Sequence, residues 1–294
     1  MYREYDAQIL NRVRLMEKQI LKEFISICEK YDLKYFVVFG TLLGTIRHKG
    51  FIPWDDDIDV GMPREDYDKF LDVAQKECGE NFFLQTVDTD SKYHLYFAKL
   101  RMKDTEFVES VLQKAGSVSG FYIDIFPYDA IPDDEKECKK YIRKTVFYSM
   151  LLSANKVKEP QTAKGNMLVN FIKDVVWFVL HYGMKALRIK GERVWKKCVE
   201  VFTEYKNSES ERLTTFSAEA NRWIIYRKEI KDLDSFEFEE LKVMVPRGYD
   251  TILKRNYGDY MKLPPVEQRV NHMPIRLRFP GERAFVSFEE NSDG

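Results

Sequence analysis

The chain has 294 residues, of which 44% are hydrophobic and 14% aromatic, enough apolar material for one large domain or two small ones. Its 47 basic and 48 acidic residues nearly cancel, which excludes a globally basic protein that binds nucleic acid without sequence preference. The charged N-terminus lacks the apolar core of a signal peptide, and we expect no membrane span. Four widely separated cysteines favour reduced thiols in a cytoplasmic protein.

The first 132 residues are predicted to form an α/β unit with a mixed sheet. Apolar residues three and four apart predict a helix over 5–31, and 34–40 resembles a short buried strand that stops at Gly40. A short helix over 41–50 is expected next, with Thr41 as its N-cap. The remaining predicted elements are a helix over 63–78 and strands over 57–62, 82–87, 94–102, 105–109 and 120–129, the last closed by Pro127.

The later part of the chain has a different character. Residues 133–207 are predicted to be helical, with breaks at Gly165, Gly183 and Gly191. The rest is mixed.

The stretch "PWDDDIDVGMP" over 53–63 places four aspartates within five positions. Carboxylates this close repel each other and raise each other's pKa, so either a cluster of Arg and Lys or a bound metal ion must offset them. Strand alternation points Ile58 and Val60 into the core and projects Asp57 and Asp59 together, about 6–7 Å apart at the base. We expect Asp55 and Asp56 at the mouth of the strand, in a supporting or solvent-facing position. The alternative, a solvated acidic turn, does not need these flanking core residues.

Asp124 sits in a similar frame, with Ile123 and Ile125 predicted to face the core. A lone aspartate in an apolar strand is costly unless it is paired or binds a metal, so we expect a third ligand on an adjacent strand rather than a structural Asp. Hard cations prefer oxygen ligands, and Asp57, Asp59 and Asp124 together would suit one or two Mg²⁺ or Mn²⁺ ions. The free N–H groups at the junction of Gly40 and Thr41 would suit a phosphate.

A glycine-ended strand, then Asp-x-Asp, then a third Asp resembles the active-site order of the nucleotidyltransferase fold, except that Thr41 stands where Gly or Ser is usual. The longer run "FGTLLGTIRHKGFIPWDDDIDVGMPREDYDKF" closely resembles the signature of the LicD/fukutin family of phosphotransferases. The stretches "FAKLR", "GFYIDIFPYD" and "YGDYMKLPP" agree with it, so the resemblance covers roughly residues 10–275. It implies a nucleotidyltransferase-like catalytic core over 1–132, a mainly helical region over 133–235 and a mixed segment over 236–294 that completes the catalytic domain.

The resemblance also implies a reaction. Members of this family transfer a phospho-alcohol from a CDP-alcohol, in bacterial members mostly CDP-choline, to a glycan or its lipid-linked precursor at the cell surface, such as lipopolysaccharide or teichoic acid, and release CMP. By this analogy Asp57 and Asp59 are metal ligands, and Asp124 completes the metal site or takes the acceptor's proton. Gly40 and Thr41 contact the donor's phosphates. The zinc site of some animal members is not expected, because no cysteines are suitably spaced.

Further side chains are candidates for binding the donor or the acceptor, and each also has a plain structural interpretation: Arg47, His48, Lys49, Trp54, Lys99 and Arg101. The three basic residues could simply end a helix, and Trp54 could stack on cytosine or pack in the core. His272 is a lone histidine, for which a structural role is the simpler interpretation.

The apolar segment 166–190 is predicted to be either an interfacial helix on the inner face of the cytoplasmic membrane or a buried core helix. Two other functions stay open. A nucleotidyltransferase would attack the α-phosphorus of an NTP and release pyrophosphate, and a non-catalytic nucleotide-binding scaffold would release nothing.

Overall fold

The computed structural model describes residues 5–109, 113, 115–158, 167–216, 220–269 and 271–288. Elements up to residue 130 follow the chain as α1 (Ala7–Lys30), β1 (Phe36–Val37), α2 (Phe39–His48), β2 (Asp59–Pro63), α3 (Arg64–Glu77), β3 (Phe82–Gln85), β4 (Ala98–Met102), β5 (Glu106–Val108) and β6 (Tyr122–Ala130). The later elements are α5 (Glu135–Lys156), α6 (Met167–Ala186), α7 (Gly191–Phe202), β7 (Arg212–Thr214), β8 (Ile225–Tyr226), α8 (Arg227–Ile230), β9 (Leu233–Phe238), β10 (Leu241–Pro246), α9 (Tyr249–Tyr257), a 3₁₀ turn (Val266–Gln268), β11 (Arg276–Arg278) and β12 (Val286–Ser287).

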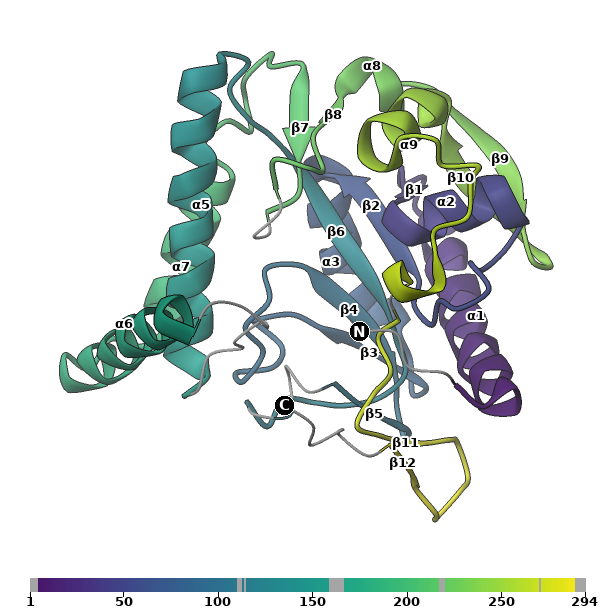
Figure 1. The fold of residues 1–294 in the computed structure, drawn as a ribbon, viewed down its shortest axis with the longest axis horizontal. Helices are drawn as coiled ribbons and strands as arrows, with labels where there is room; N and C mark the ends of the chain where they lie inside the picture. Colours follow the sequence, from purple (N-terminus) through teal and green to yellow (C-terminus); the bar gives the residue numbers. More distant parts are fainter. Residues whose placement is uncertain are drawn as a thin grey trace.

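The predicted α/β class with a mixed sheet is confirmed (Figure 1). The main sheet has the order β1-β2-β6-β4-β3, with β7 pairing to the end of β6 and to β8. Strands β2 and β6 are parallel, while β1, β4 and β3 pair antiparallel with their neighbours. Helices α1 and α3 pack against β2, β4 and β6 and cover one face of this sheet. The alternating Ile58, Val60, Ile123 and Ile125 are fully buried, which confirms the predicted side-chain directions.

Thr41 is not the N-cap of α2, as the sequence predicts. The helix begins at Phe39 with Val38 as its cap residue, and Thr41 lies inside its first turn. The Thr41 hydroxyl instead accepts a hydrogen bond from the backbone N–H of Asp59, at 2.8 Å. This bond fixes α2 to the start of β2.

Pro127 does not close its strand, because the partner strands leave a gap there. The Asp124 N–H donates to Ile58 beside β2, so the backbone N–H that Pro127 lacks would point away from β2. On that side the pairing with β4 ends opposite Ile125, and the pairing with β7 begins at Asp129. The proline therefore costs no ladder bond, and β6 continues to Ala130.

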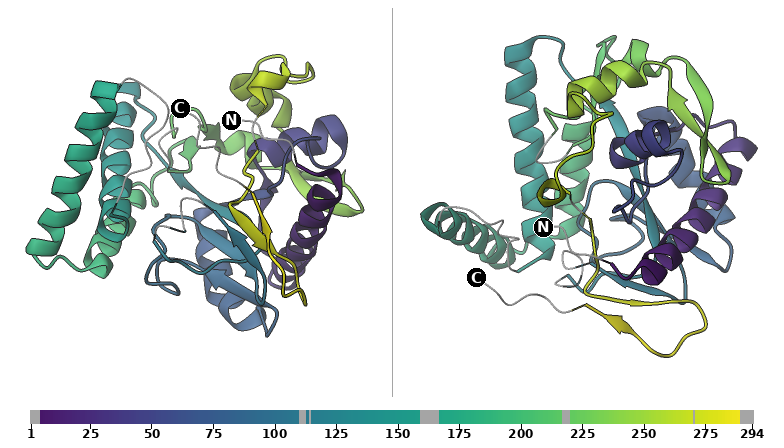
Figure 2. Two further views of the ribbon diagram at one scale, coloured as in Figure 1. Left: turned by 60° about the horizontal axis from the view of Figure 1, so that its bottom comes forward. Right: turned by 45° about the vertical axis from the view of Figure 1, so that its right-hand side comes forward.

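Helices α5, α6 and α7 pack together beside the sheet and share a hydrophobic core of their own (Figure 2). Gly191 is the first residue of α7, as the predicted break requires, but Gly183 lies within α6 and Gly165 lies outside the described residues. After these helices the chain returns to the main sheet through β7. The later segments add a β9–β10 hairpin beside β1, and β11 pairs with β5. The division into three regions stays a prediction.

Gly44 permits a close backbone approach that positions the aspartate loop. A Cβ at Gly44 would lie 2.4 Å from the Gly50 carbonyl oxygen and 3.2 Å from the Ile52 nitrogen. We expect Gly44→Ala to lower the free energy of unfolding by about 1–3 kcal/mol, because the backbone must shift. Gly183→Ala is the matched control in another helix, where nothing lies within 4 Å, and it should be neutral or stabilising. Equal stability of the two variants in urea unfolding would contradict this account.

Candidate active site

Two adjacent strands present their carboxylates on the face of the sheet opposite α1 and α3. Asp59 and Asp124 are direct neighbours in the parallel register of β2 and β6, and both line a cavity of about 1360 Å³ together with Asp57. Asp124 therefore lies on the strand next to Asp59, as expected, and its role as a third ligand stays a prediction. Asp57 itself lies just before β2, in the loop that follows α2.

Arg14 of α1 fixes the backbone of the loop that carries Asp55, Asp56 and Asp57. Its guanidinium donates to the carbonyl oxygen of Ile52 at 2.8 Å and to that of Asp55 at 2.8 and 3.1 Å. The Phe51 N–H donates to Glu239, at 3.2 Å. Because the loop backbone is fixed at several points, the acidic side chains cannot simply move apart.

Asp55 and Asp56 are buried, so of the two expected positions the solvent-facing one is wrong and the supporting one remains. Asp56 is 1% exposed and accepts hydrogen bonds from the Tyr5 hydroxyl at 2.5 Å and from the His272 backbone N–H at 2.6 Å. The His272 imidazole reaches Asp57, with Nδ1 2.9 Å from Oδ2. Ligand atoms of Asp55, Asp56, Asp57 and His272 all lie within 4.8 Å of one another.

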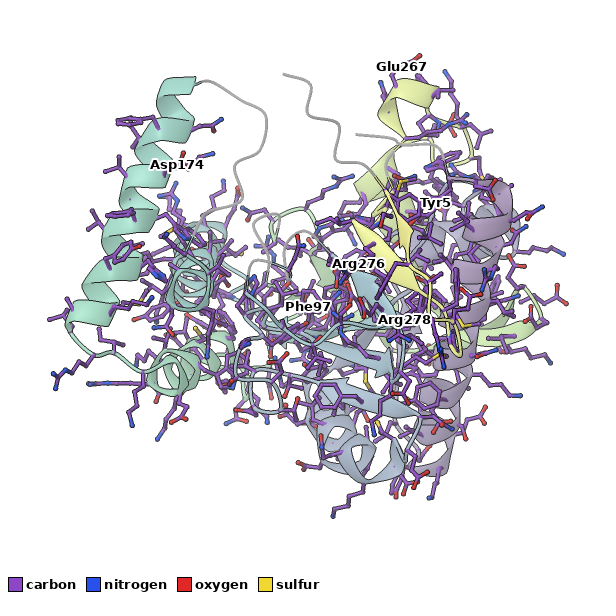
Figure 3. All side chains as sticks on the ribbon, turned by 90° about the horizontal axis from the view of Figure 1, so that it is seen from below. Tyr5, Phe97, Asp174, Glu267, Arg276 and Arg278 are labelled. Carbon is purple, nitrogen blue, oxygen red and sulfur yellow. The ribbon has the colours of Figure 1, made fainter. Side chains whose placement is uncertain are left out.

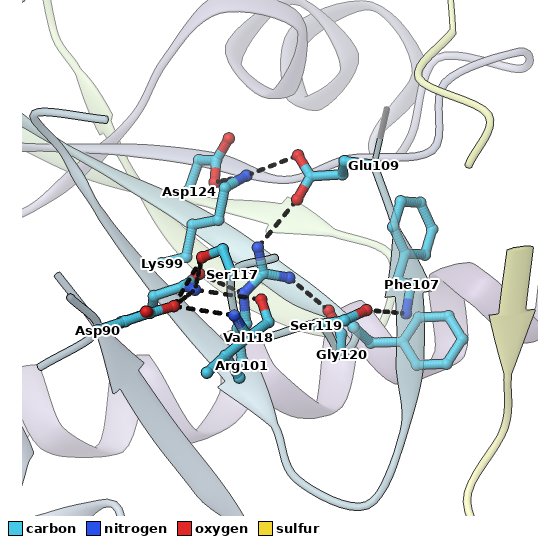
Figure 4. A network of polar contacts seen from close by, with 12 residues as sticks. Asp90, Lys99, Arg101, Phe107, Glu109, Ser117, Val118, Ser119, Gly120 and Asp124 are labelled. Atoms are coloured by element: carbon cyan, nitrogen blue, oxygen red, sulfur yellow. Dashed lines mark hydrogen bonds and ion pairs between the residues drawn. The ribbon is translucent and has the colours of Figure 1, made fainter. Parts of the chain in front are cut away.

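Asp124 is neutralised by a second set of contacts (Figure 4). The Lys99 ammonium, opposite it on β4, lies 2.7 Å from Asp124 and 3.1 Å from Glu109. Arg101 pairs with the other Glu109 oxygen at 2.9 Å and donates to the Gly120 carbonyl at 2.7 Å. Lys99 and Arg101 are both 1% exposed, which an ion-paired network permits.

Asp59 is the exception in this site. It is 8% exposed, and among the described residues no side chain or backbone N–H donates to its carboxylate. Burial, followed by the charges of Asp57 and Asp124, raises the pKa of Asp59 well above its ordinary value. At least one abnormally high carboxyl pKa is what the clustering of aspartates predicts.

The pKa values of Asp57, His272 and Asp124 are shifted by burial and by their charged partners. Burial opposes ionisation of Asp57, but the charge of His272 and the hydrogen bond from it outweigh burial and lower the Asp57 pKa. The Asp57 charge raises the pKa of His272 well above its usual value. Burial raises the pKa of Asp124 to about 6, although Lys99 opposes this shift. His272 and Asp57 therefore form a charged pair.

The described side chains whose ligand atoms cluster within 4.8 Å are Asp55, Asp56, Asp57 and His272, a group that could hold a metal ion and that does not include Asp59 or Asp124. Asp59 lines the same cavity, and no described group donates to its carboxylate. Oxygen ligands of this kind suit hard cations such as Mg²⁺.

The other predicted site residues divide into two groups. Gly40, Arg47, Trp54 and Lys99 line the cavity, whereas Thr41, His48, Lys49 and Arg101 are absent from its described lining. Gly40 lies against the aspartate loop, since a Cβ there would be 2.7 Å from Asp55 Oδ2.

Two of the residues that line the cavity, Arg47 and Trp54, also contact other parts of the protein. Arg47 donates to the Tyr260 carbonyl at 2.7 Å, and the Arg269 guanidinium lies 4.3 Å from the centre of the Trp54 ring.

Sequence reasoning missed several lining residues from distant parts of the chain: Phe39, Phe97, Glu109, Tyr122, Phe126, Arg222, Trp223 and Tyr257. Single aromatic and charged residues of this kind carry no local pattern. His272 was singled out only as a lone histidine, and only the tertiary contact with Asp57 marks it as part of the site.

Buried carboxylates and cations around one open cavity are typical of enzymes that transfer phosphate-containing groups. Comparison with known proteins agrees. Residues 32–153 match the family described as LicD/FKTN/FKRP, nucleotidyltransferase domain. The lipopolysaccharide cholinephosphotransferase LicD of Haemophilus influenzae is 32% identical over 286 residues, covering 90% of this chain and 97% of that protein. The chain therefore belongs to the LicD/fukutin family.

More distant relatives match shorter parts of the chain. An uncharacterised protein of Rickettsia typhi is 27% identical over 49% of this chain and 54% of its own length. Human ribitol 5-phosphate transferase FKRP is 31% identical over 62 residues, which is 21% of this chain and 12% of that protein.

Asp59→Asn should stabilise the metal-free protein in a pH-dependent way. A carboxyl whose pKa is raised by folding stabilises the folded state below its ordinary pKa, and this stabilisation is lost as the pH rises through the folded pKa. In the presence of a chelator, we expect Asp59→Asn to be neutral near pH 4 and to add about 1–3 kcal/mol to the free energy of unfolding at pH 8.

Asp72→Asn, at an exposed position on α3, is the control and should show no such trend. Urea unfolding of both variants across this pH range measures the effect. A destabilised Asp59→Asn variant at pH 8 would contradict it.

Proposed function

We propose that this protein transfers phosphocholine from CDP-choline to a hydroxyl of a cell-surface glycan or its lipid-linked precursor and releases CMP. The observation that carries the proposal is the convergence of Asp57, Asp59 and Asp124 on one cavity, in a chain that aligns with a cholinephosphotransferase over 90% of its length. The acceptor of that relative, lipopolysaccharide, makes a glycan of this kind our first choice.

The bond between the choline-bearing phosphorus and the bridging oxygen of the diphosphate breaks, and a bond to the acceptor oxygen forms. Asp57 and Asp59 would hold one or two Mg²⁺ ions, which when bound supply neutralisation of the diphosphate charge. Arg47 and Arg222 line the same cavity and add positive charge for the phosphates, whereas the Lys99 ammonium is paired with Asp124 and Glu109.

Asp124 is our candidate for the acceptor's proton. Its pKa of about 6 lies closer to neutrality than that of an ordinary carboxylate, which suits a general base. The Lys99 ammonium at 2.7 Å orients Asp124, and Glu109 in turn holds Lys99. Removal of the proton makes the acceptor oxygen a better nucleophile as CMP leaves.

Thermal stabilisation by nucleotides tests the donor and the metal without an acceptor. We expect CDP-choline with Mg²⁺ to raise the melting temperature more than CDP-ethanolamine, CDP-glycerol, CDP-ribitol or CTP, because a ligand of the folded state stabilises it by mass action. Asp57→Ala and Asp59→Asn should lose the Mg²⁺-dependent part, while Asp72→Asn should keep it.

A shift with CTP but with no CDP-alcohol, together with pyrophosphate release, would favour nucleotidyl transfer instead. No shift with any nucleotide would favour the non-catalytic scaffold. Release of CMP in the presence of acceptor would separate phosphocholine transfer from both.

We also propose that α6 lies on the membrane that carries a lipid-linked acceptor. Met184 joins the core shared with α5 and α7, but other apolar side chains of α6 face solvent: Phe171 is 64%, Phe178 56% and Val179 63% exposed. Figure 3 shows α6, marked by Asp174, set apart from the sheet. None of the described helices is long and apolar enough to cross a bilayer.

The charges around α6 favour an anionic lipid surface over a second protein. Exposed basic residues accompany its apolar face, namely Lys173, Lys185, Arg188 and Lys190. The opposite face is tied to α5, since the Trp177 indole donates to the Val157 carbonyl at 3.0 Å and His181 Nδ1 lies 2.7 Å from the Ala154 oxygen. The helix is therefore held with its apolar face outward.

Flotation with vesicles tests this membrane contact. The wild type should bind vesicles that contain anionic lipid, and Phe171→Ser combined with Val179→Ser should weaken binding about tenfold or more, because less apolar area enters the interface. Leu15→Ser, at another exposed apolar position on α1, should bind as the wild type does. No binding of the wild type to vesicles, with a stable dimer in solution, would show that α6 covers a second copy instead.

A further inference from the structure

A smaller cavity of about 370 Å³ adjoins the carboxylate site. The two cavities share part of their lining, namely Phe39, Leu95, Phe97, Phe126 and Trp223. A ligand in the larger cavity can therefore extend one end into the smaller one, which we call the aromatic chamber.

Packed aromatic rings form a wall along the zone that the two cavities share. Phe39 packs against Trp223 with ring centres 4.4 Å apart and against Phe126 at 5.1 Å, and Phe97 packs on Phe126 at 4.3 Å. Phe39 also has a φ of +46°, a conformation that is costly for a bulky residue and is concentrated at functional sites. The fold thus holds this ring in place at the junction of β1 and α2.

The aromatic chamber carries no charged side chain among its described lining residues. Besides the shared residues, these are His94, Tyr96, Ser149, Leu152, Ser153 and Thr215. Burial lowers the pKa of His94 to about 4, so its imidazole is neutral at physiological pH. The larger cavity, by contrast, contains Lys99 and the Arg222 guanidinium, which lies 4.7 Å from the centre of the Trp223 ring.

The chamber directly borders the reacting groups. The Phe97 ring centre is 5.6 Å from the Lys99 ammonium, which is 2.7 Å from Asp124. Phe39 immediately precedes Gly40, which lies against Asp55. Phosphocholine has only two carbons between its phosphate and its ammonium group, so a site for the ammonium must lie this close to the site for the phosphate.

We propose that the aromatic chamber receives the quaternary ammonium group of the donor, which deepens the proposed function and rests on it. A quaternary ammonium has no N–H donors to satisfy, and the faces of Phe and Trp rings attract it. The buried Ser149 hydroxyl oxygen and His94 Nδ1, which have no described partner, can accept weak C–H contacts from its methyl groups. The neutral hydroxyls of glycerol or ribitol would gain no comparable attraction from the rings and could bond only to the few polar atoms of the chamber, such as those of Ser149, His94 and Thr215.

Affinity for matched nucleotides tests the inference by calorimetry with Mg²⁺ present. CDP-choline is compared with its uncharged carbon analogue, CDP-3,3-dimethylbutanol, and with CDP-ethanolamine and CDP-ribitol. We expect the wild type to bind CDP-choline about tenfold more tightly than the carbon analogue, because only the cation gains from the ring faces.

Two aromatic substitutions locate the effect. Trp223→Leu and Phe97→Leu change part-exposed residues and should bring the choline preference close to onefold, while Trp223→Phe should retain most of it. Phe147→Leu, which removes an exposed aromatic outside both cavities, should behave as the wild type.

The outcomes separate the two proposals. If the wild type binds CDP-choline and its carbon analogue equally, or if both leucine variants keep the preference, the chamber does not bind the ammonium group, although the proposed function stands. If the wild type binds CDP-ribitol most tightly or no CDP-alcohol at all, both proposals are wrong. If one leucine variant does not fold, the other still locates the effect.

Discussion

The mutual repulsion of buried carboxylates is the constraint on which the rest of this structure depends. Four aspartates of one loop and strand, with Asp124 of the neighbouring strand, lie largely out of water. Charges so placed persist only if cations or protons offset them. Much of the molecule does this work: α1 supplies Arg14 to the loop backbone, β4 supplies Lys99 to Asp124, and the C-terminal segment supplies His272 to Asp57.

The negative charges of the carboxylates are not all neutralised to the same extent. Asp57 and Asp124 have cationic partners, whereas Asp59 lies between them without a described partner. Its helix partner, Thr41, contacts only its backbone. Because the Asp59 carboxylate is not paired with a described side chain, it is available to bind a cation that arrives with the substrate. The partners of Asp57 and Asp124 hold the neighbouring carboxylate oxygens in place. The adjoining aromatic surface has the opposite property, since it offers apolar faces without charge.

The alternating sequence pattern predicted the directions of side chains on the strands, but not the contacts between distant segments. The alternation of Ile and Val with Asp in β2 and β6 was sufficient to point Asp59 and Asp124 away from the core, because a strand has a period of two. Asp57 lies in the loop before β2, where this period does not apply. The positions of Asp55, Asp56 and His272, and the aromatic wall, depend on contacts between distant segments, which no local pattern records. The helix α6 was ambiguous for a different reason: its composition suits either a core or an interface, and only its neighbours decide which.

Asp56 accepts one hydrogen bond from Tyr5 and another from His272, residues 51 and 216 positions away along the sequence. A single carboxylate thus joins the two ends of the described chain at the cavity. Contacts of such high sequence separation form slowly, because the entropy of closing a long loop must be lost first. A ribosome-bound chain that lacks its last segment would already contain all the aspartates but not the imidazole beside them. The site therefore depends on the segment that carries His272 as well as on the sheet.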